Sequence, residues 1–339
     1  MSLFDRFSPV FTDELRGKPL YTLIRNAVRP DGSLPVDFAL PQKAWRHKIT
    51  FMDGALDGIM LYHSDSPRQD VRPLCAAFDQ IAAGDFGGAD RLLYSYFRKR
   101  ENPRMLRVID PLQEWIQRER GGVDAELLYR YALAVIERSV RTEEIKFALA
   151  LLELLDTGDD AAVRQMVTTL ALSDEFTLFA LYIERRWPDG NAQVFETAQR
   201  VHGWGRIHAV EQLEPDNGEI RSWLLHEGWD NRVMGEYSAL TCARKGGLLE
   251  RLEQPRISRA DFTSAGQLLV LLTNAGPVSG LNDFERPSAL LSAYLAHAAA
   301  MADTREDLMA LDAVKAYVES SALPDKPMLL EACRRVREK

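Results

Sequence analysis

Two turns in the middle of the sequence bring tryptophan, arginine and histidine together. Residues 202–208 read His-Gly-Trp-Gly-Arg-Ile-His, and residues 228–232 read Gly-Trp-Asp-Asn-Arg. Arginine beside tryptophan can hold an anionic or planar group through charge-assisted hydrogen bonds and stacking. If adjacent helix pairs stack, the two turns lie side by side along one edge and gather these side chains into one neighbourhood. The candidate contact residues are His202, Trp204, Arg206, His208, Glu211, Trp229 and Arg232.

These Gly-Trp turns also have a structural interpretation, which the sequence favours. Glycine ends a helix, tryptophan covers the seam between helix pairs, and arginine bonds a carbonyl at a helix end. His208 and Glu211 are three residues apart and share a helix edge, where they can serve a metal ion or a proton relay. No third ligand stands at helical spacing, so we expect a hydrogen-bonded His–Glu pair and no metal site.

A second candidate lies nearer the N-terminus, where Asp53-Gly54 and Asp57-Gly58 precede His63. Two carboxylates and an imidazole can bind a divalent cation. The segment lacks the alternating oxygen ligands of an EF-hand loop, and Asp-Gly pairs are typical of turns, so the turn interpretation is favoured. Residues 45–48, Trp-Arg-His-Lys, either contact a partner or dock this arm on the first helices.

The common catalytic signatures are absent from the sequence. It contains no phosphate-cradling G-x-x-x-x-G-K-[ST], no G-x-G-x-x-G after a strand, no G-x-S-x-G and no H-E-x-x-H. We therefore name no catalytic residue and expect no cofactor. An enzyme of another class is not excluded, although the sequence leans towards a protein without catalytic activity.

Charge and cysteine content restrict the class of protein further. The 339 residues carry 42 basic and 50 acidic side chains, and an acidic chain repels phosphate backbones. The densest basic run, Arg98 to Arg100 with Arg104, fits a helix end, so we do not expect nucleic-acid binding. Three widely separated cysteines form no C-x-x-C pair, which suits reduced thiols in the cytoplasm.

No membrane association is expected from the sequence. The longest apolar run is about six residues, far short of the roughly 20 that a membrane span needs. The N-terminal residues show no basic segment followed by a long apolar stretch, so we expect no export signal.

The elements that would position these residues are nearly all helices. Prolines recur through the first 70 residues and prevent long helices there, leaving short helices and a β-hairpin of strands 48–52 and 58–63 as the expectation. From Arg72 onwards the pattern is helical. The predicted helices are 72–82, 86–99, 111–119, 124–138, 142–156, 159–171, 173–187, 191–202, 205–213, 217–227, 231–244, 259–275, 287–302, 304–320 and 326–337.

The middle of this series is repetitive. Pairing consecutive helices gives second members that start near residues 142, 173, 205 and 231. A single pair cannot bury both of its apolar faces, so such pairs stack and share a core. The helix at 142–156 is apolar on nearly every side, which is typical of a layer between neighbours.

Two short segments add a family resemblance. Residues 160–164 read Asp-Ala-Ala-Val-Arg, and residues 206–213 read Arg-Ile-His-Ala-Val-Glu-Gln-Leu. These resemble the Asp-x-x-Val-Arg and Arg-x-x-Ala-x-x-x-Leu patterns of HEAT-like repeats, over about residues 125–250. The resemblance implies an α-solenoid, and a scaffold for partner proteins more often than an enzyme.

The sequence thus predicts an all-α, α-solenoid-like stack of antiparallel helix pairs with an irregular, proline-rich N-terminal segment. The expected divisions are 1–70 for that segment, 71–123 for a helical lead-in, 124–250 for the repeats and 251–339 for the C-terminal helices. The function we expect is a cytoplasmic scaffold that binds a protein or peptide. The alternatives are an enzyme or small-molecule site at the Gly-Trp turns, and nucleic-acid binding through a basic groove.

Overall fold

The computed structural model describes residues 17–41, 51–63, 69–99, 105–274, 276 and 278–338. Within these ranges the protein is all-helical, with eighteen α-helices and no strand. Its contacts divide the chain into two compact units, unit 1 (residues 1–209) and unit 2 (residues 210–339). The four sequence divisions predicted above stay a prediction.

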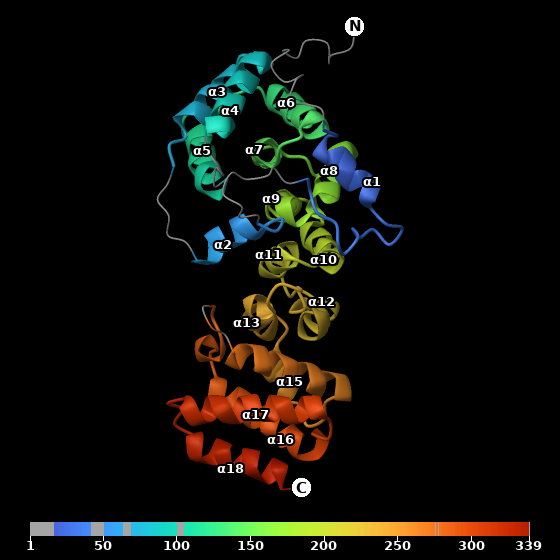
Figure 1. Ribbon diagram of the computed structural model, residues 1–339, viewed down its shortest axis with the longest axis vertical. Helices are drawn as coiled ribbons and strands as arrows, with labels where there is room; N and C mark the ends of the chain where they lie inside the picture. The colour runs from blue at the N-terminus through green and yellow to red at the C-terminus, as the bar shows by residue number, and fades with distance from the viewer. Residues whose placement is uncertain are drawn as a thin grey trace. The chain divides into compact units, whose positions relative to one another are not determined.

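Unit 1 contains the first ten helices and the start of α11. They are α1 (Leu20–Ala27), α2 (Ala55–His63), α3 (Arg72–Ala82), α4 (Phe86–Lys99), α5 (Leu106–Glu119), α6 (Ala125–Arg138), α7 (Thr142–Leu152), α8 (Ala161–Ala171), α9 (Asp174–Glu184), α10 (Gly190–Arg200) and α11 (Trp204–Gln212). Neighbours in sequence pack together as α3 with α4, α6 with α7 and α8 with α9, and α1 lies against α6 and α8 (Figure 1).

Helix α7 is the centre of unit 1. It packs against α5, α6 and α9, and every side chain from Ile145 to Leu152 is buried. A surface helix is apolar on one side only, whereas a helix covered on all sides is apolar nearly all round. The nearly uniform apolar sequence of α7 predicted this burial. Lys146 is the one basic residue of α7, and it is buried among these apolar side chains, so its charge requires an explanation.

Two predictions about the first half of the chain were wrong. Residues 58–63 form part of α2 rather than a strand, and residues 51–52 are irregular, while 48–50 lie outside the described ranges. A short apolar run suits a buried helix as well as a strand. The helix predicted over 111–119 begins earlier, at Leu106, so Pro111 lies inside α5 and not in its first turn.

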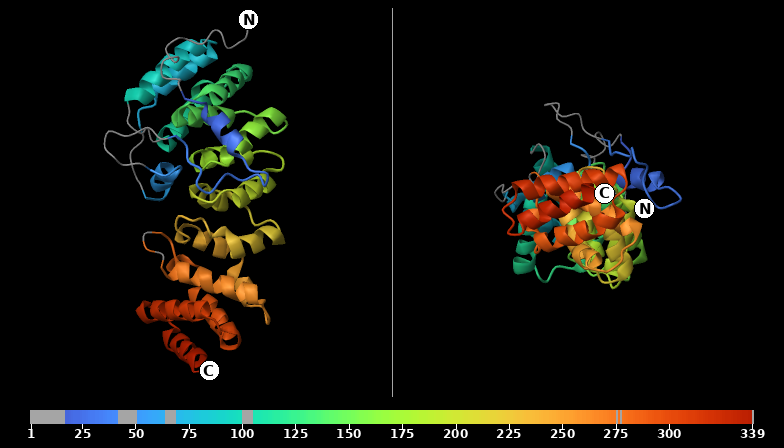
Figure 2. Two further views of the ribbon diagram at one scale, coloured as in Figure 1. Left: turned by 45° about the vertical axis from the view of Figure 1, so that its right-hand side comes forward. Right: turned by 90° about the horizontal axis from the view of Figure 1, so that it is seen from below.

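Unit 2 consists of shorter helices followed by a compact group of longer ones. Its elements are α12 (Gly218–Trp223), the π-helical turn η3 (Leu224–Gly228), α13 (Glu236–Lys245), α14 (Leu248–Leu252), α15 (Arg259–Thr273), the 3-10 turn η4 (Leu281–Asp283), α16 (Pro287–Met301), α17 (Arg305–Ser320) and α18 (Lys326–Arg337). Helix α15 packs against α13, α16 and α17, and α18 covers α16 and α17 (Figure 2).

The helix starts follow the capping residues in the sequence. The side chain of Ser258 accepts the amide of Asp261 at the start of α15, and that of Thr304 accepts the amide of Asp307 at the start of α17. Both aspartates return a bond to the cap residue, which completes a capping box. No helix of the described ranges is long and apolar enough to cross a membrane.

Candidate functional site

The first Gly-Trp turn packs against the Asp53-Gly54 turn and against α2, about 150 residues earlier in the sequence. The turn interpretation was wrong for Asp57-Gly58, because both residues lie inside α2. The indole of Trp204 is 4% exposed and lies against Gly58 of α2. A Cβ atom at residue 58 would stand 2.1 Å from the Trp204 ring, so only glycine allows this approach. Residues 54–58 and Trp204, which are remote in sequence, therefore lie together in unit 1.

Backbone amides fix this junction to the start of α9. Asp174 accepts the amide of Gly205 at 3.0 Å, and Glu175 accepts the amide of Gly54 at 2.8 Å. Gly54 has a φ of 74°, which favours glycine. Removal of the Asp174 carboxyl from water raises its pKa to about 6, although the hydrogen bond from Gly205 opposes the change.

Lys146 lies beneath the junction. Its ammonium donates to Asp57 of α2 and to Glu175 of α9, each at 2.5 Å, and Lys146 and Asp57 are 4% and 3% exposed. Burial alone would lower the pKa of Lys146, but the two carboxylates outweigh it and raise that pKa. The lysine therefore stays charged and joins α7 to α2 and α9.

His208 of α11 completes this group. It is 1% exposed, its ring stacks on Tyr62 with 6.3 Å between centroids, and neither of its ring nitrogens has a hydrogen-bond partner in the described part of the chain. Burial, and then the charge of Lys146, lower the pKa of His208 to about 3. The imidazole is neutral at pH 7, and the hydrogen bond predicted between His208 and Glu211 is wrong.

The group formed by the buried residues Asp57, Lys146 and His208 and the half-buried Glu175 has two chemical interpretations. A neutral imidazole beside an ammonium and two carboxylates contains the residue types of proton transfer, and perturbed pKa values are typical of functional sites. The same contacts dock α2 on α7 and α9, which is a structural role. Within the described ranges no group of three His, Cys, Asp or Glu residues is arranged to hold a metal ion.

The remaining residues predicted for the first turn have local structural partners. The guanidinium of Arg206 donates to the carbonyls of Val201 (2.7 Å) and Gln199 (3.3 Å) at the end of α10. In unit 2 the carboxylate of Glu211 accepts a hydrogen bond from the Thr241 hydroxyl. His202 is half-buried at the turn itself.

The other polar segments singled out in the sequence also have described contacts. Asp53 accepts the amide of Leu40 at 2.9 Å, and His63 is exposed at the end of α2. Arg98 stacks over Tyr94 with 5.7 Å to the ring centroid. Residues 45–48 and 100–104 lie outside the described ranges, as does the side chain of Lys99.

Glu184 is another buried carboxyl in unit 1 that the sequence did not reveal. It is fully buried at the end of α9, and its carboxyl oxygens lie 3.0 and 3.2 Å from the Thr197 hydroxyl, which donates to them. Burial raises its pKa to about 8, with the Thr197 bond opposing the change. Glu184 is therefore mostly protonated at neutral pH.

The second Gly-Trp turn is organised by a residue that sequence reasoning missed. Asn231 is fully buried, and its side-chain oxygen accepts the amides of Val233 and Met234 at 3.0 and 2.9 Å. This arrangement holds Arg232 at a φ of 59° with its side chain exposed. That the two Gly-Trp turns lie side by side stays a prediction.

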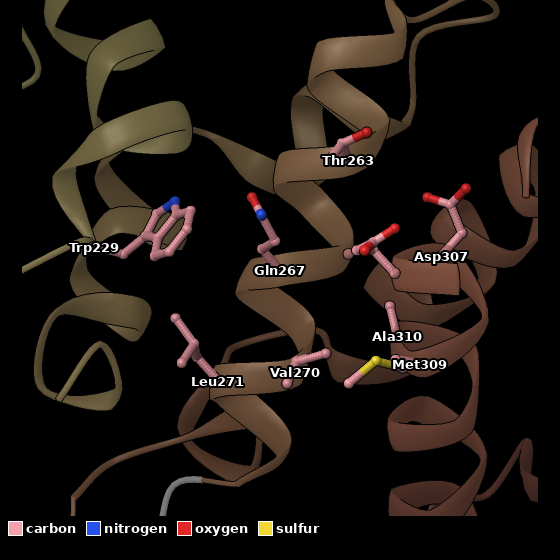
Figure 3. Close-up of a pocket in the computed structure, with 10 residues that line it drawn as sticks. Trp229, Thr263, Gln267, Val270, Leu271, Asp307, Met309 and Ala310 are labelled. Atoms are coloured by element: carbon pink, nitrogen blue, oxygen red, sulfur yellow. The ribbon is translucent and has the colours of Figure 1, made fainter. Parts of the chain in front are cut away.

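Trp229 lines a pocket of about 260 Å³ in unit 2, and its indole nitrogen donates to the Leu225 carbonyl at 3.0 Å. The pocket lies between Trp229 and helices α15 and α17, with polar groups at one end and apolar side chains at the other (Figure 3). Its lining residues are Trp229, Thr263, Gly266, Gln267, Val270, Leu271, Glu306, Asp307, Met309 and Ala310.

A buried hydroxyl lies directly behind the pocket wall. Tyr294 of α16 is fully buried, and its hydroxyl has no hydrogen-bond partner in the described part of the chain. A Cβ atom at Gly266 would stand 3.1 Å from this oxygen and 3.2 Å from the Ala310 methyl. The tyrosine ring stacks on Phe262 with 5.1 Å between centroids, which fixes its direction.

Comparison with known proteins adds no family. No family model matches the sequence, and no curated protein and no solved structure matches it. The resemblance to HEAT-like repeats therefore rests on the two short segments alone.

Proposed function

We propose that the protein is a helical scaffold that binds a protein or peptide partner, and that one partner side chain enters the α15–α17 pocket. The observation that carries this proposal is the pocket itself, with Trp229, Val270, Leu271 and Met309 around it. A concave, mostly apolar surface with a few polar groups is the usual form of a binding site.

The size of the pocket favours a side chain over a cofactor. Its volume of about 260 Å³ is below the roughly 300–1,000 Å³ of typical small-molecule sites. Gln267, Glu306 and Met309 line it and are exposed, so the pocket opens to solvent. An occupant anchored there can continue across the surface of the protein.

Exposed apolar side chains extend the pocket along α17. Met309 is 58% exposed and the adjacent Leu308 is 44% exposed. Large apolar side chains grouped beside a pocket are typical of protein-binding surfaces, and methionine adapts to varied partners. These side chains offer more contact area than a small molecule in the pocket would cover.

The scaffold architecture that we propose is an α-solenoid-like stack. It is supported by the packing of α6 on α7 and of α8 on α9, and by the contact of α7 with α9, which links the two pairs. A stack of helix pairs presents a long surface to its partners. The cytoplasm is the proposed compartment, with the thiols of Cys75 and Cys333 in support.

A catalytic or small-molecule site at the first Gly-Trp turn is the second candidate function. It is favoured by His208, whose unpaired neutral imidazole stacks on Tyr62 close to the charge of Lys146. An unsatisfied buried polar group costs roughly 1–3 kcal/mol, so its retention calls for a reason.

The test of the proposed function is a selection of peptides from a displayed library on the full chain. Gln267→Trp fills the pocket from an exposed position, and Ala316→Trp places the same side chain at an exposed position of α17 away from it. We expect selected peptides to bind the wild type and Ala316→Trp alike and to lose at least about tenfold in affinity for Gln267→Trp, since an anchor residue is worth about 1.4 kcal/mol or more. Equal binding to all three proteins, or no selected peptide, contradicts the proposal.

A further inference from the structure

The pocket has a polar end that carries negative charge. Thr263, Glu306 and Asp307 lie towards the starts of α15 and α17, and Gln267 lies at the middle of α15. Val270, Leu271 and Met309 lie further along the same helices. Among the residues that the structure describes, no lysine or arginine lines the pocket. The site is therefore suited to an occupant with an apolar part and a cationic part.

The two acidic side chains have different roles. Asp307 is buried, and its carboxylate accepts the Arg259 guanidinium at 2.5 Å and the amide of Thr304 at 2.9 Å, so its charge is already compensated. Glu306 is exposed, and in the described part of the chain no cation pairs with it. The carboxylate that remains open to a ligand is that of Glu306.

The aromatic wall suits the same cation. Trp229 is half-buried, and its nitrogen is fixed to Leu225, which leaves the indole ring as a wall of the pocket (Figure 3). A cation over an indole face gains about 0.5–1 kcal/mol at an exposed site and more where water is excluded. Trp229 and Glu306 thus favour the same sign of charge from two sides of the pocket.

We propose that the occupant of the pocket is a partner peptide in which a large apolar side chain is followed by lysine or arginine. The apolar side chain lies among Leu271, Val270 and Met309, and the cation lies against Glu306 and the Trp229 ring. This inference rests on the proposed function and adds the chemistry of the partner to it.

The test uses two synthetic peptides of equal length, Gly-Gly-Phe-Lys-Gly-Gly and Gly-Gly-Phe-Glu-Gly-Gly, with 3-phenylpropylamine as a small-molecule probe. The full chain is labelled with ¹³C at the methionine methyl groups, and the Met309 signal, assigned with Met309→Leu, reports occupation of the pocket. We expect the lysine peptide to bind at least about threefold more tightly than the glutamate peptide, the range of an exposed ion pair.

The variant Glu306→Gln removes the charge, and Glu219→Gln, an exposed acid on α12, is the matched control. The preference for lysine falls in Glu306→Gln, where only the Trp229 ring still favours a cation, and persists unchanged in Glu219→Gln. Equal binding of both peptides to the wild type overturns this inference and leaves the proposed function intact. Binding of the amine without either peptide overturns the choice of a peptide, and a Met309 signal that no probe shifts contradicts both proposals.

Discussion

The ammonium of Lys146 lies 2.5 Å from the carboxylate of Asp57, and both side chains are buried. Asp57 belongs to α2, an element of the proline-rich N-terminal segment, and Lys146 belongs to the most deeply buried helix of unit 1. The pair therefore fastens the N-terminal segment to the helical core by a bond that is inaccessible to water. Glu175 accepts from the same ammonium and adds α9 to this contact.

Removing the cation tests this connection. In Lys146→Met the buried carboxylate of Asp57 and the half-buried carboxylate of Glu175 lose their counter-charge, and breaking a buried ion pair in this way costs about 3–5 kcal/mol. We expect a loss of that size in the free energy of unfolding of unit 1, measured by urea titration. Lys315→Met removes an exposed lysine paired with Glu319 and is expected to cost less than about 1 kcal/mol. Similar values for both variants would refute a special role of Lys146.

The contact of Gly58 with Trp204 gives a second prediction. Alanine normally stabilises a helix interior by about 0.5–1 kcal/mol relative to glycine. At residue 58 the added methyl group would overlap the indole, so Gly58→Ala is expected to destabilise the docking of α2 by about 1–3 kcal/mol. Hydrogen exchange of residues 55–63 measures this as faster exchange. Gly122→Ala, at a site with nothing within 4 Å, is the control and should leave that exchange unchanged.

The helices were predictable where local signals mark their ends. Helices α3 and α4 begin and end at the predicted residues, and α17 begins one residue after the predicted start, with Thr304 as its cap. Residues 58–63 were assigned wrongly because an apolar run of that length has no decisive period. What makes it a helix is the burial of α2 against Trp204, a contact between residues remote in sequence.

The candidate site was predictable only in part for the same reason. The sequence marks both the Gly-Trp turn and the Asp-Gly pairs as candidates. It does not predict that they lie in contact, because that contact depends on the tertiary fold. Lys146 was not among the predicted site residues. A lysine in a helix that is apolar on nearly every side nevertheless indicates a buried charge that needs a partner. Glu184 and Tyr294 carried no comparable signal, because their burial follows from the packing of neighbouring helices.

Glu184 predicts an alkaline loss of stability. Its pKa is raised from 4.5 to about 8 in the folded protein, so the folded state keeps a proton that the unfolded chain releases. Its contribution is fully present below pH 4.5 and is lost as the pH rises through 8, by a total on the order of 5 kcal/mol. Glu184→Gln cannot ionise. We expect its melting temperature to match that of the wild type near pH 5 and to exceed it at pH 9.

The control for this pH profile is Glu126→Gln, which removes an exposed carboxylate from the first turn of α6. Its melting temperature should run parallel to that of the wild type between pH 6 and pH 9. If Glu184→Gln also ran parallel over that range, the carboxyl of Glu184 would be ionised in the folded protein, contrary to its burial.

Tyr294 gives a prediction about the stability of unit 2. Its hydroxyl is buried, and in the described part of the chain it has no hydrogen-bond partner, which costs roughly 1–3 kcal/mol. Tyr294→Phe is therefore expected to stabilise the protein by about 1 kcal/mol, measured by thermal unfolding. Because the hydroxyl lies behind the pocket wall, the affinity for the Phe-Lys peptide in the Met309 titration should stay unchanged.

Tyr317→Phe is the matched control, because the hydroxyl of Tyr317 donates to Asn282 at 2.7 Å, and its removal should lower stability slightly. A Tyr294→Phe protein that is no more stable than the wild type would show that the buried hydroxyl carries no such cost.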